Sequence, residues 1–263
     1  MTHSRPDNPH RERPLRLLLL AGSAEGRQIA GALARVPGVQ ARAALPRAEW
    51  RPIPLGLPTR IGGWGGREAF AKWLRAERLH AVIDATHPFA ARMSNRAAEV
   101  TDALGLDYIR FVLPSWRPGP GDRWTFLNTA ADAARHVPED ATVFLSTGRH
   151  TLPAFAALAG RTVYCRLIDA PLDPFPFAKG GFVRGRRPFA VEDERELLAE
   201  LRVDWVVAHN TGSREEHAKL DAARTLGLPV ALLRRPAPPE GVTRCGTMSE
   251  LMAWVARRVQ PAP

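Results

Sequence analysis

The feature that most constrains the fold is a short apolar run that ends in a glycine turn. Leu17–Leu20 is continuously apolar, as expected for a parallel strand that is buried on both faces. Gly22-Ser23-Ala24-Glu25-Gly26 interrupts this run, and a helical pattern through Ile29 and Leu33 follows it. A strand, a glycine turn and a helix in this order predict the start of a doubly wound α/β domain.

The same alternation of strands and helices continues in two blocks. Residues 15–113 predict a first Rossmann-like domain, residues 114–123 are rich in proline and glycine and predict a linker, and residues 124–260 predict a second Rossmann-like domain. In the second block we expect strands at 142–145, 162–167, 205–208 and 230–233, and helices at 130–136, 152–159, 191–201, 218–226 and 248–258. The expected fold is therefore α/β, with two doubly wound parallel-sheet domains and a ligand-binding cleft between them.

The termini and the cysteines bear on where the protein works. Residues 1–14 are polar and predict a disordered lead-in. The apolar stretch 15–21 contains Arg16 and is too short for a signal peptide, and no run approaches the roughly 20 residues that cross a bilayer. Cys165 and Cys245 show no metal-ligand spacing. We therefore expect a cytoplasmic protein with no metal site and no membrane partner.

The charge balance is strongly basic and allows several kinds of partner. The chain has 37 Lys+Arg against 27 Asp+Glu, a formal net charge of +10. This excess suits nucleic acid, an anionic membrane or a polyanionic small molecule, and an arginine-rich genome explains it as well. The chain has no nucleic-acid-binding module, G-x-S-x-G elbow, H-E-x-x-H motif or P-loop. Because no nucleic-acid module is present, we expect no nucleic-acid partner.

The glycine turn 22–27 is the first candidate site. Backbone N–H groups at the start of a helix can bind an anion, and Gly22 and Gly26 would let a ligand approach the backbone closely. Ser23 can cap the helix or bind a phosphate, and Arg27 lies one turn further on. Ala24 stands where a full G-x-G-x-x-G motif has its middle glycine, so a plain tight turn stays open as the alternative.

A second glycine-rich segment follows at 62–66. Four glycines around Trp64 are costly in backbone entropy, which loops accept where the backbone must approach a ligand closely. A flexible surface loop is the alternative for the glycines, and a place in the core is the alternative for Trp64.

The segment Asp84–Ala90 lies at the carboxyl end of a predicted strand, where open α/β sheets bind ligands. Thr86, or a residue near it, could cap the next helix, with Pro88 near its first turn. His87 could donate a proton, since histidine is the side chain that ordinarily changes charge near neutral pH, or it could only fix the turn. Ser94 and Asn95 add donors further along this helix.

Two polar clusters repeat this theme in the second block. Ser146-Thr147-Gly148-Arg149 follows one predicted strand, and Asn210-Thr211-Gly212 follows another, with Lys219 close behind. Hydroxyl, glycine and basic residues at strand ends suit an anionic ligand, because arginine matches the geometry of a carboxylate.

In combination these segments resemble the precorrin-6A reductase family. The resemblance runs from about residue 15 to residue 236, and the D-A-T-H-P-F-A stretch at 84–90 is its most specific element. The chain departs from the family pattern at Ala21-Gly22-Ser23, where a G-G-T or G-T-T start is expected. It departs again at His209, where the family has lysine. A third departure is Arg186-Arg187-Pro188-Phe189, where the family usually has a small residue followed by Gly-Pro-Phe.

The resemblance implies NADPH-dependent reduction of precorrin-6A to precorrin-6B in cobalamin biosynthesis, with hydride added to carbon 19 of the ring and a proton to carbon 18. The substrate is a polycarboxylate tetrapyrrole, and other enzymes of the pathway are possible partners. The alternatives are the cobalt-loaded ring of the anaerobic route and a non-catalytic NADP(H)-sensing protein.

The same comparison assigns residues to roles. His87 is the candidate proton donor. Arg42, near the end of a predicted second strand at 39–45, is a candidate for the 2′-phosphate of NADPH from its position and not from the resemblance, with a solvated arginine as the alternative. Cofactor binding is expected from Gly22, Ser23, Ala24, Glu25, Gly26, Arg27, Gly62, Gly63, Trp64, Gly65, Thr86, His87, Pro88 and Phe89. Substrate binding is expected from Ser94, Asn95, Thr147, Gly148, Arg149, Asn210, Thr211, Gly212 and Lys219.

Overall fold

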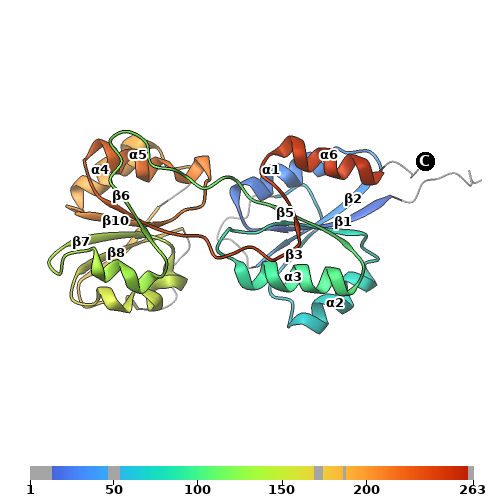
Figure 1. The fold of residues 1–263 in the computed structure, drawn as a ribbon, viewed down its shortest axis with the longest axis horizontal. Helices are drawn as coiled ribbons and strands as arrows, with labels where there is room; N and C mark the ends of the chain where they lie inside the picture. The colour runs from blue at the N-terminus through green and yellow to red at the C-terminus, as the bar shows by residue number, and fades with distance from the viewer. Residues whose placement is uncertain (1–13, 47–53, 169–173, 186–187, 260–263) are drawn as a thin grey trace, which may run out of the picture. The chain divides into compact units, whose positions relative to one another are not determined.

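The chain forms two α/β units in a computed structural model that describes residues 14–46, 54–168, 174–185 and 188–259 (Figure 1). It passes from the first unit to the second between Val112 and Leu113, and it returns between Ala237 and Pro238. Each unit contains a six-stranded sheet, and every strand pair in both sheets is parallel. The predicted α/β class with two Rossmann-like domains is confirmed, while the cleft between them stays a prediction.

The first sheet has the strand order of a dinucleotide-binding fold. Hydrogen bonding orders its strands β3-β2-β1-β4-β5-β12. From β1 the chain continues to β2 and β3 on one side of the sheet, and from β4 it continues to β5 on the other side. The topological switch point therefore lies between β1 and β4. The strands are β1 (Leu15–Ala21), β2 (Val39–Leu45), β3 (Thr59–Ile61), β4 (Ala81–Ala85), β5 (Asp107–Phe111) and β12 (Thr243–Cys245).

Helices cover both faces of the first sheet, which explains why β1 is apolar throughout. In Figure 1, α1 (Ala24–Leu33) and α6 (Met248–Val259) lie on one face, and α2 (Arg67–Ala76) and α3 (Ala91–Ala103) lie on the other. The side chains of Leu17, Leu18 and Leu19 are fully buried. The Leu18 face packs into a core cluster that includes Phe70 and Leu74 of α2.

The second sheet repeats this pattern, with β7 in the place of β1. Its order is β9-β8-β7-β10-β11-β6, so its switch point lies between β7 and β10. In Figure 1, α4 (Val191–Glu200) and α5 (Ala218–Thr225) lie on one face, and the 3₁₀ helices η1 (Ala130–Arg135) and η2 (Arg149–Leu158) lie on the other. The strands are β6 (Trp124–Leu127), β7 (Thr142–Ser146), β8 (Thr162–Leu167), β9 (Gly180–Arg184), β10 (Trp205–His209) and β11 (Val230–Leu233), and a third 3₁₀ helix, η3, spans Arg214–Glu216.

The predicted domain boundary at the carboxyl end is wrong. Residues 238–259 were expected in the second domain, but Thr243 of β12 pairs with Ile109 of β5 and so completes the first sheet. The strand β6, which follows β5 in the chain, pairs with β11 and so belongs to the second sheet. A three-residue strand such as β12 carries no apolar run that could indicate which sheet it joins.

The predicted linker at 114–123 is also corrected, because this segment belongs to the second unit and Trp116 is hydrogen-bonded there. The helices predicted at 130–136 and 152–159 are 3₁₀ helices, and the second contains Pro153 and a kink at Phe155. The lead-in, residues 1–13, lies outside the described residues. Within the described part of the chain, every helix is too short or too polar to span a bilayer.

Candidate functional site

The two predicted segments of the first domain meet at the switch point of its sheet. Ala21 pairs with Ala85 at the ends of β1 and β4, so the turn at Gly22 and the segment at Thr86 leave the same edge side by side. A Cβ atom on Gly22 would lie 3.4 Å from the His87 nitrogen and 3.4 Å from the Thr86 Cα. The two backbones are therefore in contact at the place where open α/β sheets bind ligands.

Ser23 caps the helix that begins in this turn. Its hydroxyl oxygen accepts a hydrogen bond from the Gly26 nitrogen at 3.1 Å, and α1 begins at Ala24. Because the hydroxyl acts as acceptor in this bond, its own hydrogen can be donated to another group. Glu25 lies in the same turn, where its carboxylate complements the helix dipole and competes with an anion. The turn therefore offers backbone N–H groups and the Ser23 hydroxyl at the start of α1, beside the negative charge of Glu25.

Gly26 serves helix packing. A Cβ atom at this position would lie 3.3 Å from the Ala21 Cα and 3.5 Å from the Ala85 carbonyl oxygen. The missing side chain lets α1 approach the ends of β1 and β4, the role that the third glycine has in dinucleotide-binding turns. Gly26 was expected to allow close approach of a ligand, and the structure instead places it between helix and sheet. Arg27, one residue further on, is half-buried.

A buried ionic network holds the segment that follows β4. The Asp84 carboxylate is fully buried and accepts hydrogen bonds from the Thr86 nitrogen at 3.0 Å and the Thr86 hydroxyl at 2.7 Å. It also accepts from the Tyr108 hydroxyl at 2.7 Å and from Arg110 Nη1 at 2.5 Å. Burial raises the pKa of Tyr108, and the Asp84 charge raises it further. Asp84 therefore fixes the turn that lies against Gly22. The prediction that Thr86 caps the next helix is wrong, because its hydroxyl binds Asp84 and the N-cap residue of α3 is Ala90.

Ser94 and Asn95, both predicted to bind substrate, have different surroundings on α3. Ser94 accepts a short hydrogen bond from Arg110 and is buried inside the Asp84 network. Asn95 is exposed. The sequence indicated Asp84 only as the start of a motif, and nothing in its pattern pointed to Arg110 as the partner.

His87 follows Thr86 at the switch point and is half-buried. Its Nδ1 accepts a hydrogen bond from the Phe89 nitrogen at 3.3 Å, and the two rings lie 5.8 Å apart. With Nδ1 as an acceptor, a neutral imidazole carries its hydrogen on Nε2. The contact orients the ring in the turn that also contains Pro88.

The glycine-rich segment after β3 owes its composition to backbone conformation. Gly62, Gly65 and Gly66 have positive φ angles of 110°, 72° and 113°. A Cβ atom on Gly62, Gly63 or Gly66 would meet nothing within 4 Å, so no close approach within the protein requires these glycines. Open space at these positions is compatible with a ligand.

Trp64 belongs to the core. Its side chain is 9% exposed, and its ring centroid lies 4.6 Å from that of Phe70 and 4.9 Å from that of Trp73. The alternative that Trp64 plugs the core is therefore confirmed. Only its backbone remains for the predicted contact with a cofactor.

The turn after β7 occupies the corresponding switch point in the second sheet. Ser146 pairs with Ala208 of β10, so the turn and the end of β10 lie side by side. The Thr147 and Thr151 hydroxyls are 2.7 Å apart, and Gly148 has a positive φ angle of 84°. Arg149 begins η2 and is half-buried. The predicted residues thus come together at this edge.

Asn210 binds the segment that enters the second unit. It is 4% exposed, its Oδ1 accepts from the Trp116 nitrogen at 2.8 Å, and its Nδ2 donates to the Trp116 carbonyl oxygen at 3.1 Å. A Cβ atom on Gly212 would lie 2.1 Å from the Pro114 oxygen. Arg235 Nη1 donates to the Leu113 oxygen at 2.5 Å. These three residues clamp residues 113–116, a role for which the sequence gave no signal at Arg235.

Thr211 and Lys219 also have protein partners. The Thr211 hydroxyl donates to the Glu216 carboxylate at 2.9 Å, and Lys219 Nζ donates to the Glu216 carbonyl oxygen at 2.8 Å. Lys219 is 8% exposed and lies 5.9 Å from the Trp116 ring centroid. Their predicted contacts with substrate stay predictions, and in the structure both side chains donate to Glu216.

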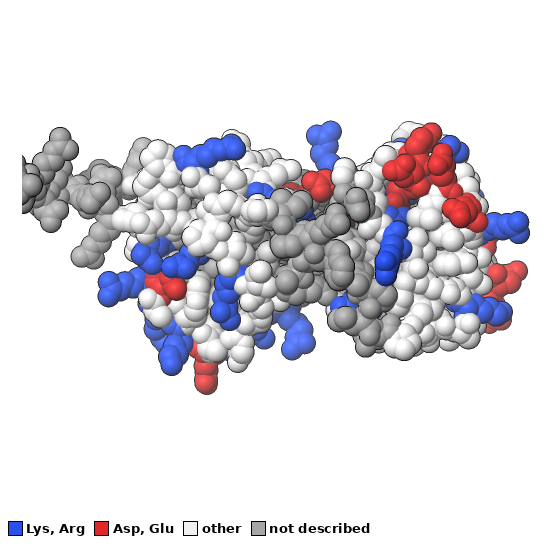
Figure 2. Space-filling view, turned by 180° about the vertical axis from the view of Figure 1, so that it is seen from behind, with Lys and Arg blue, Asp and Glu red and all other residues white. Residues whose placement is uncertain are grey.

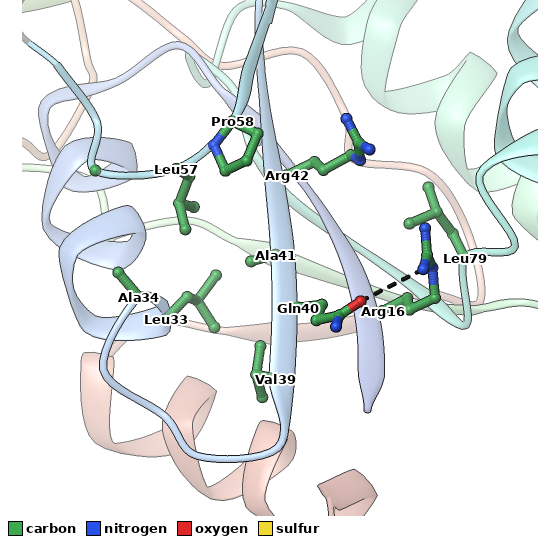
Figure 3. A pocket seen from close by; sticks show the side chains of 11 residues that line it. Arg16, Leu33, Ala34, Val39, Gln40, Ala41, Arg42, Leu57, Pro58 and Leu79 are labelled. Atoms are coloured by element: carbon green, nitrogen blue, oxygen red, sulfur yellow. Dashed lines mark hydrogen bonds between the residues drawn. The ribbon is translucent and has the colours of Figure 1, made fainter. Parts of the chain in front are cut away.

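A cavity of about 360 Å³ lies elsewhere, beside the first halves of β1 and β2 (Figure 3). Arg16, Gln40 and Arg42 line it together with aliphatic side chains. Arg42 pairs with Leu18 in mid-sheet, and its Nε is 2.9 Å from the Glu77 carboxylate. The predicted position of Arg42 near the end of the strand is therefore wrong, and this cavity is separate from the switch point.

Basic side chains do not form one stripe on the face shown in Figure 2, where they are scattered over both units. Within the described residues, no group of three or more histidine, cysteine, aspartate or glutamate residues is placed to hold a metal ion. The candidate site is therefore made of backbone donors, hydroxyls and single arginines.

The comparisons with known proteins agree on one family. The family model of precorrin-6x reductase CbiJ/CobK matches residues 16–256. A precorrin-6A reductase of Rhodococcus erythropolis is 40% identical over 242 residues, 91% of this chain and 97% of that protein. A cobalt-precorrin-6A reductase of Priestia megaterium is 26% identical over 239 residues, 84% of this chain and 90% of that protein. A solved CobK precorrin-6A reductase matches with a TM-score of 0.86 and 39% identity over 92% of this chain and 96% of that one. The chain belongs to the CbiJ/CobK family of precorrin-6x reductases.

Proposed function

We propose that this chain reduces precorrin-6A to precorrin-6B with NADPH, adding hydride to carbon 19 of the ring and a proton to carbon 18. The step belongs to cobalamin biosynthesis. The metal-free ring is favoured because the precorrin-6A reductase of Rhodococcus erythropolis is 40% identical to this chain, whereas the cobalt-precorrin-6A reductase of Priestia megaterium is 26% identical. The cobalt-loaded ring is the second candidate.

The single observation that carries the cofactor assignment is the contact of Gly22 with the Thr86–His87 backbone at the β1/β4 switch point. The N-terminus of α1 offers N–H groups and the Ser23 hydroxyl to a pyrophosphate. The network around Asp84 holds Thr86 in place, which keeps the other side of the crevice rigid. NADPH bound here would supply the hydride, and the chain's own residues position it.

The switch point of the second sheet is the proposed place for the carboxylates of the macrocycle. Thr147, Gly148 and Arg149 present a hydroxyl, an open backbone and a guanidinium at this edge. Arginine binds a carboxylate through two parallel hydrogen bonds. The clamp around Asn210 gives this edge a rigid neighbour, which favours fixed positions for the substrate groups.

His87 is the proposed proton donor. A histidine donates a proton as the imidazolium, and the neutral ring that remains accepts at Nδ1 from the Phe89 nitrogen. Replacement of His87 by alanine should lower kcat strongly while the affinity for NADPH changes little. Full turnover by this variant would remove the histidine from the mechanism and leave water as the donor.

The test is an assay of the purified protein with precorrin-6A and, separately, with cobalt-precorrin-6A, each in the presence of NADPH or NADH. We expect oxidation of NADPH on addition of the metal-free ring and slower oxidation with the cobalt-loaded ring. Binding of NADPH without oxidation by either ring would support a non-catalytic NADP(H)-sensing protein instead. Failure to bind NADPH would refute the proposal.

A further inference from the structure

Arg60 lies one strand away from the carboxyl end of β2. It is the middle residue of β3, the edge strand, and it pairs with Ala44 of β2. The nitrogen of Gly62 donates to the Leu45 carbonyl oxygen at 3.0 Å, which ties the following loop to the end of β2. Since adjacent strands are about 4.8 Å apart, the backbone of Arg60 borders the end of β2.

The guanidinium of Arg60 has two contacts within the first unit. Its Cζ lies 4.8 Å from the centroid of the Trp64 ring, and Nη2 donates to the Gly63 oxygen at 2.9 Å. Trp64 is itself fixed in the core, so the arginine stacks on a rigid surface. The hydrogen bond to Gly63 uses one of the five N–H donors of the group. Arg60 is exposed, and it forms no ion pair with any acidic residue that the structure describes.

Three other arginines of the first unit have carboxylate partners. Arg42 Nε is 2.9 Å from the Glu77 carboxylate, and Arg67 Nη1 is 3.2 Å from the Glu99 carboxylate. Arg110 is buried against Asp84. Arg60 therefore differs from these three in presenting an ordered guanidinium to solvent at the carboxyl edge of the sheet.

The end of β2 is where Rossmann domains distinguish the two nicotinamide cofactors. An acidic residue there binds the ribose 2′-hydroxyl of NAD, and an arginine nearby accommodates the 2′-phosphate of NADP. The described residues at the end of β2, Val39 to Pro46, include no aspartate or glutamate. We infer that Arg60 binds the 2′-phosphate of NADPH and sets the preference for NADPH over NADH. This inference rests on the proposed binding of NADPH at the β1/β4 switch point.

The test measures binding as well as activity. The wild type, Arg60→Ala and Arg60→Lys are titrated with NADPH, NADH, adenosine 2′,5′-bisphosphate and adenosine 5′-monophosphate. Loss of a charge-assisted contact should weaken the binding of NADPH and of the 2′,5′-bisphosphate about 10- to 100-fold in Arg60→Ala. Binding of NADH and of the monophosphate should stay within about twofold, and Arg60→Lys should recover part of the loss.

Arg67→Ala is the matched control, because Arg67 is another exposed arginine that follows the same loop. It should keep the wild-type preference for NADPH. If Arg60→Ala keeps the full preference for NADPH over NADH, the inference about Arg60 is overturned. It is also overturned if only Arg67→Ala loses this preference. Both results leave the proposed binding of NADPH intact. Equal binding of NADPH and NADH by the wild type would overturn the inference about Arg60, and failure to bind either cofactor would overturn both proposals.

Discussion

Arg110 on β5 donates to the carboxylate of Asp84 on β4, and both side chains are almost completely buried. The same carboxylate binds the nitrogen and the hydroxyl of Thr86, which contacts Gly22 across the switch point. One buried charge thus fixes the backbone on one side of the proposed crevice. Removing Arg110 would leave the Asp84 carboxylate buried without a cation to balance its charge.

Replacement of Arg110 by methionine should lower the free energy of unfolding by about 3–5 kcal/mol, because Asp84 loses its cationic partner. The double variant Asp84→Asn, Arg110→Met should recover part of this loss, since it leaves no buried charge. Urea unfolding followed by circular dichroism measures both variants. Arg67→Ala is the control, because its pair with Glu99 is exposed and should contribute about 0–1 kcal/mol. A loss in Arg110→Met no larger than in this control would contradict the role of the network.

The clamp on residues 113–116 depends on a glycine with no room for a side chain. Gly212→Ala should destabilise the protein by more than Gly148→Ala, although both glycines have positive φ angles, 73° and 84°. In Gly148→Ala the cost is the left-handed backbone alone, about 1–2 kcal/mol, because nothing lies within 4 Å of the added Cβ. In Gly212→Ala the Cβ also meets the Pro114 oxygen at 2.1 Å.

Hydrogen exchange should locate this effect. The Trp116 amide, which donates to Asn210 Oδ1, should exchange faster in Gly212→Ala and in Asn210→Ala than in Gly148→Ala. Equal destabilisation by the two glycine variants, with unchanged exchange at Trp116, would show that no clamp exists.

Ser23 has two separable roles, helix cap and phosphate donor. Ser23→Ala should lower stability by about 0.5–2 kcal/mol, whereas Ser23→Gly should lower it by only a few tenths. Both variants lack the hydroxyl, so both should weaken NADPH binding to a similar degree. Thr129→Ala removes the cap of η1 in the second unit and should lower stability without changing this affinity. If Ser23→Gly binds NADPH as well as the wild type, the hydroxyl does not touch the cofactor.

The two cysteines should be unreactive in the folded protein. Burial raises the pKa of Cys165 to about 12 and that of Cys245 to about 11, so neither thiol forms much thiolate at neutral pH. A disulfide exchange reagent such as DTNB at mildly alkaline pH should therefore react slowly with the native protein. Both thiols should react quickly in urea. A fast-reacting thiol in the native protein would show that one of these side chains is accessible.

Strand periodicity was enough to predict the sheets but not which unit every strand joins. Leu17–Leu20 and Ala81–Ile83 are apolar because helices cover both faces, and this pattern is local. The pairing of β12 with β5 is not local, and a strand of three residues, Thr243–Cys245, carries no periodic signal. β9 was missed because it begins with Gly180 and Gly181. A Cβ on Gly180 would lie 1.8 Å from the Val163 oxygen, so the glycine is required there by packing.

The candidate site was predictable where a motif ends a strand and was hidden where side chains act inside the protein. The segments at Gly22 and Thr86 come together as the switch-point rule predicts. The rule does not reveal that Ser94 and Asn210 are occupied by Arg110 and by the Trp116 backbone, because these partners are distant in sequence. It gave Arg42 as a phosphate contact on position, whereas the structure pairs that arginine with Glu77.

Transfer of deuterium from the cofactor tests the central claim most directly. The protein would be incubated with precorrin-6A and with NADPH deuterated at the transferable position of the nicotinamide, in ordinary water. The product would then be analysed by NMR. The account predicts one deuterium from the cofactor at carbon 19 of the ring and hydrogen from solvent at carbon 18. A ring that gains no deuterium, with NADPH left unoxidised, would contradict it.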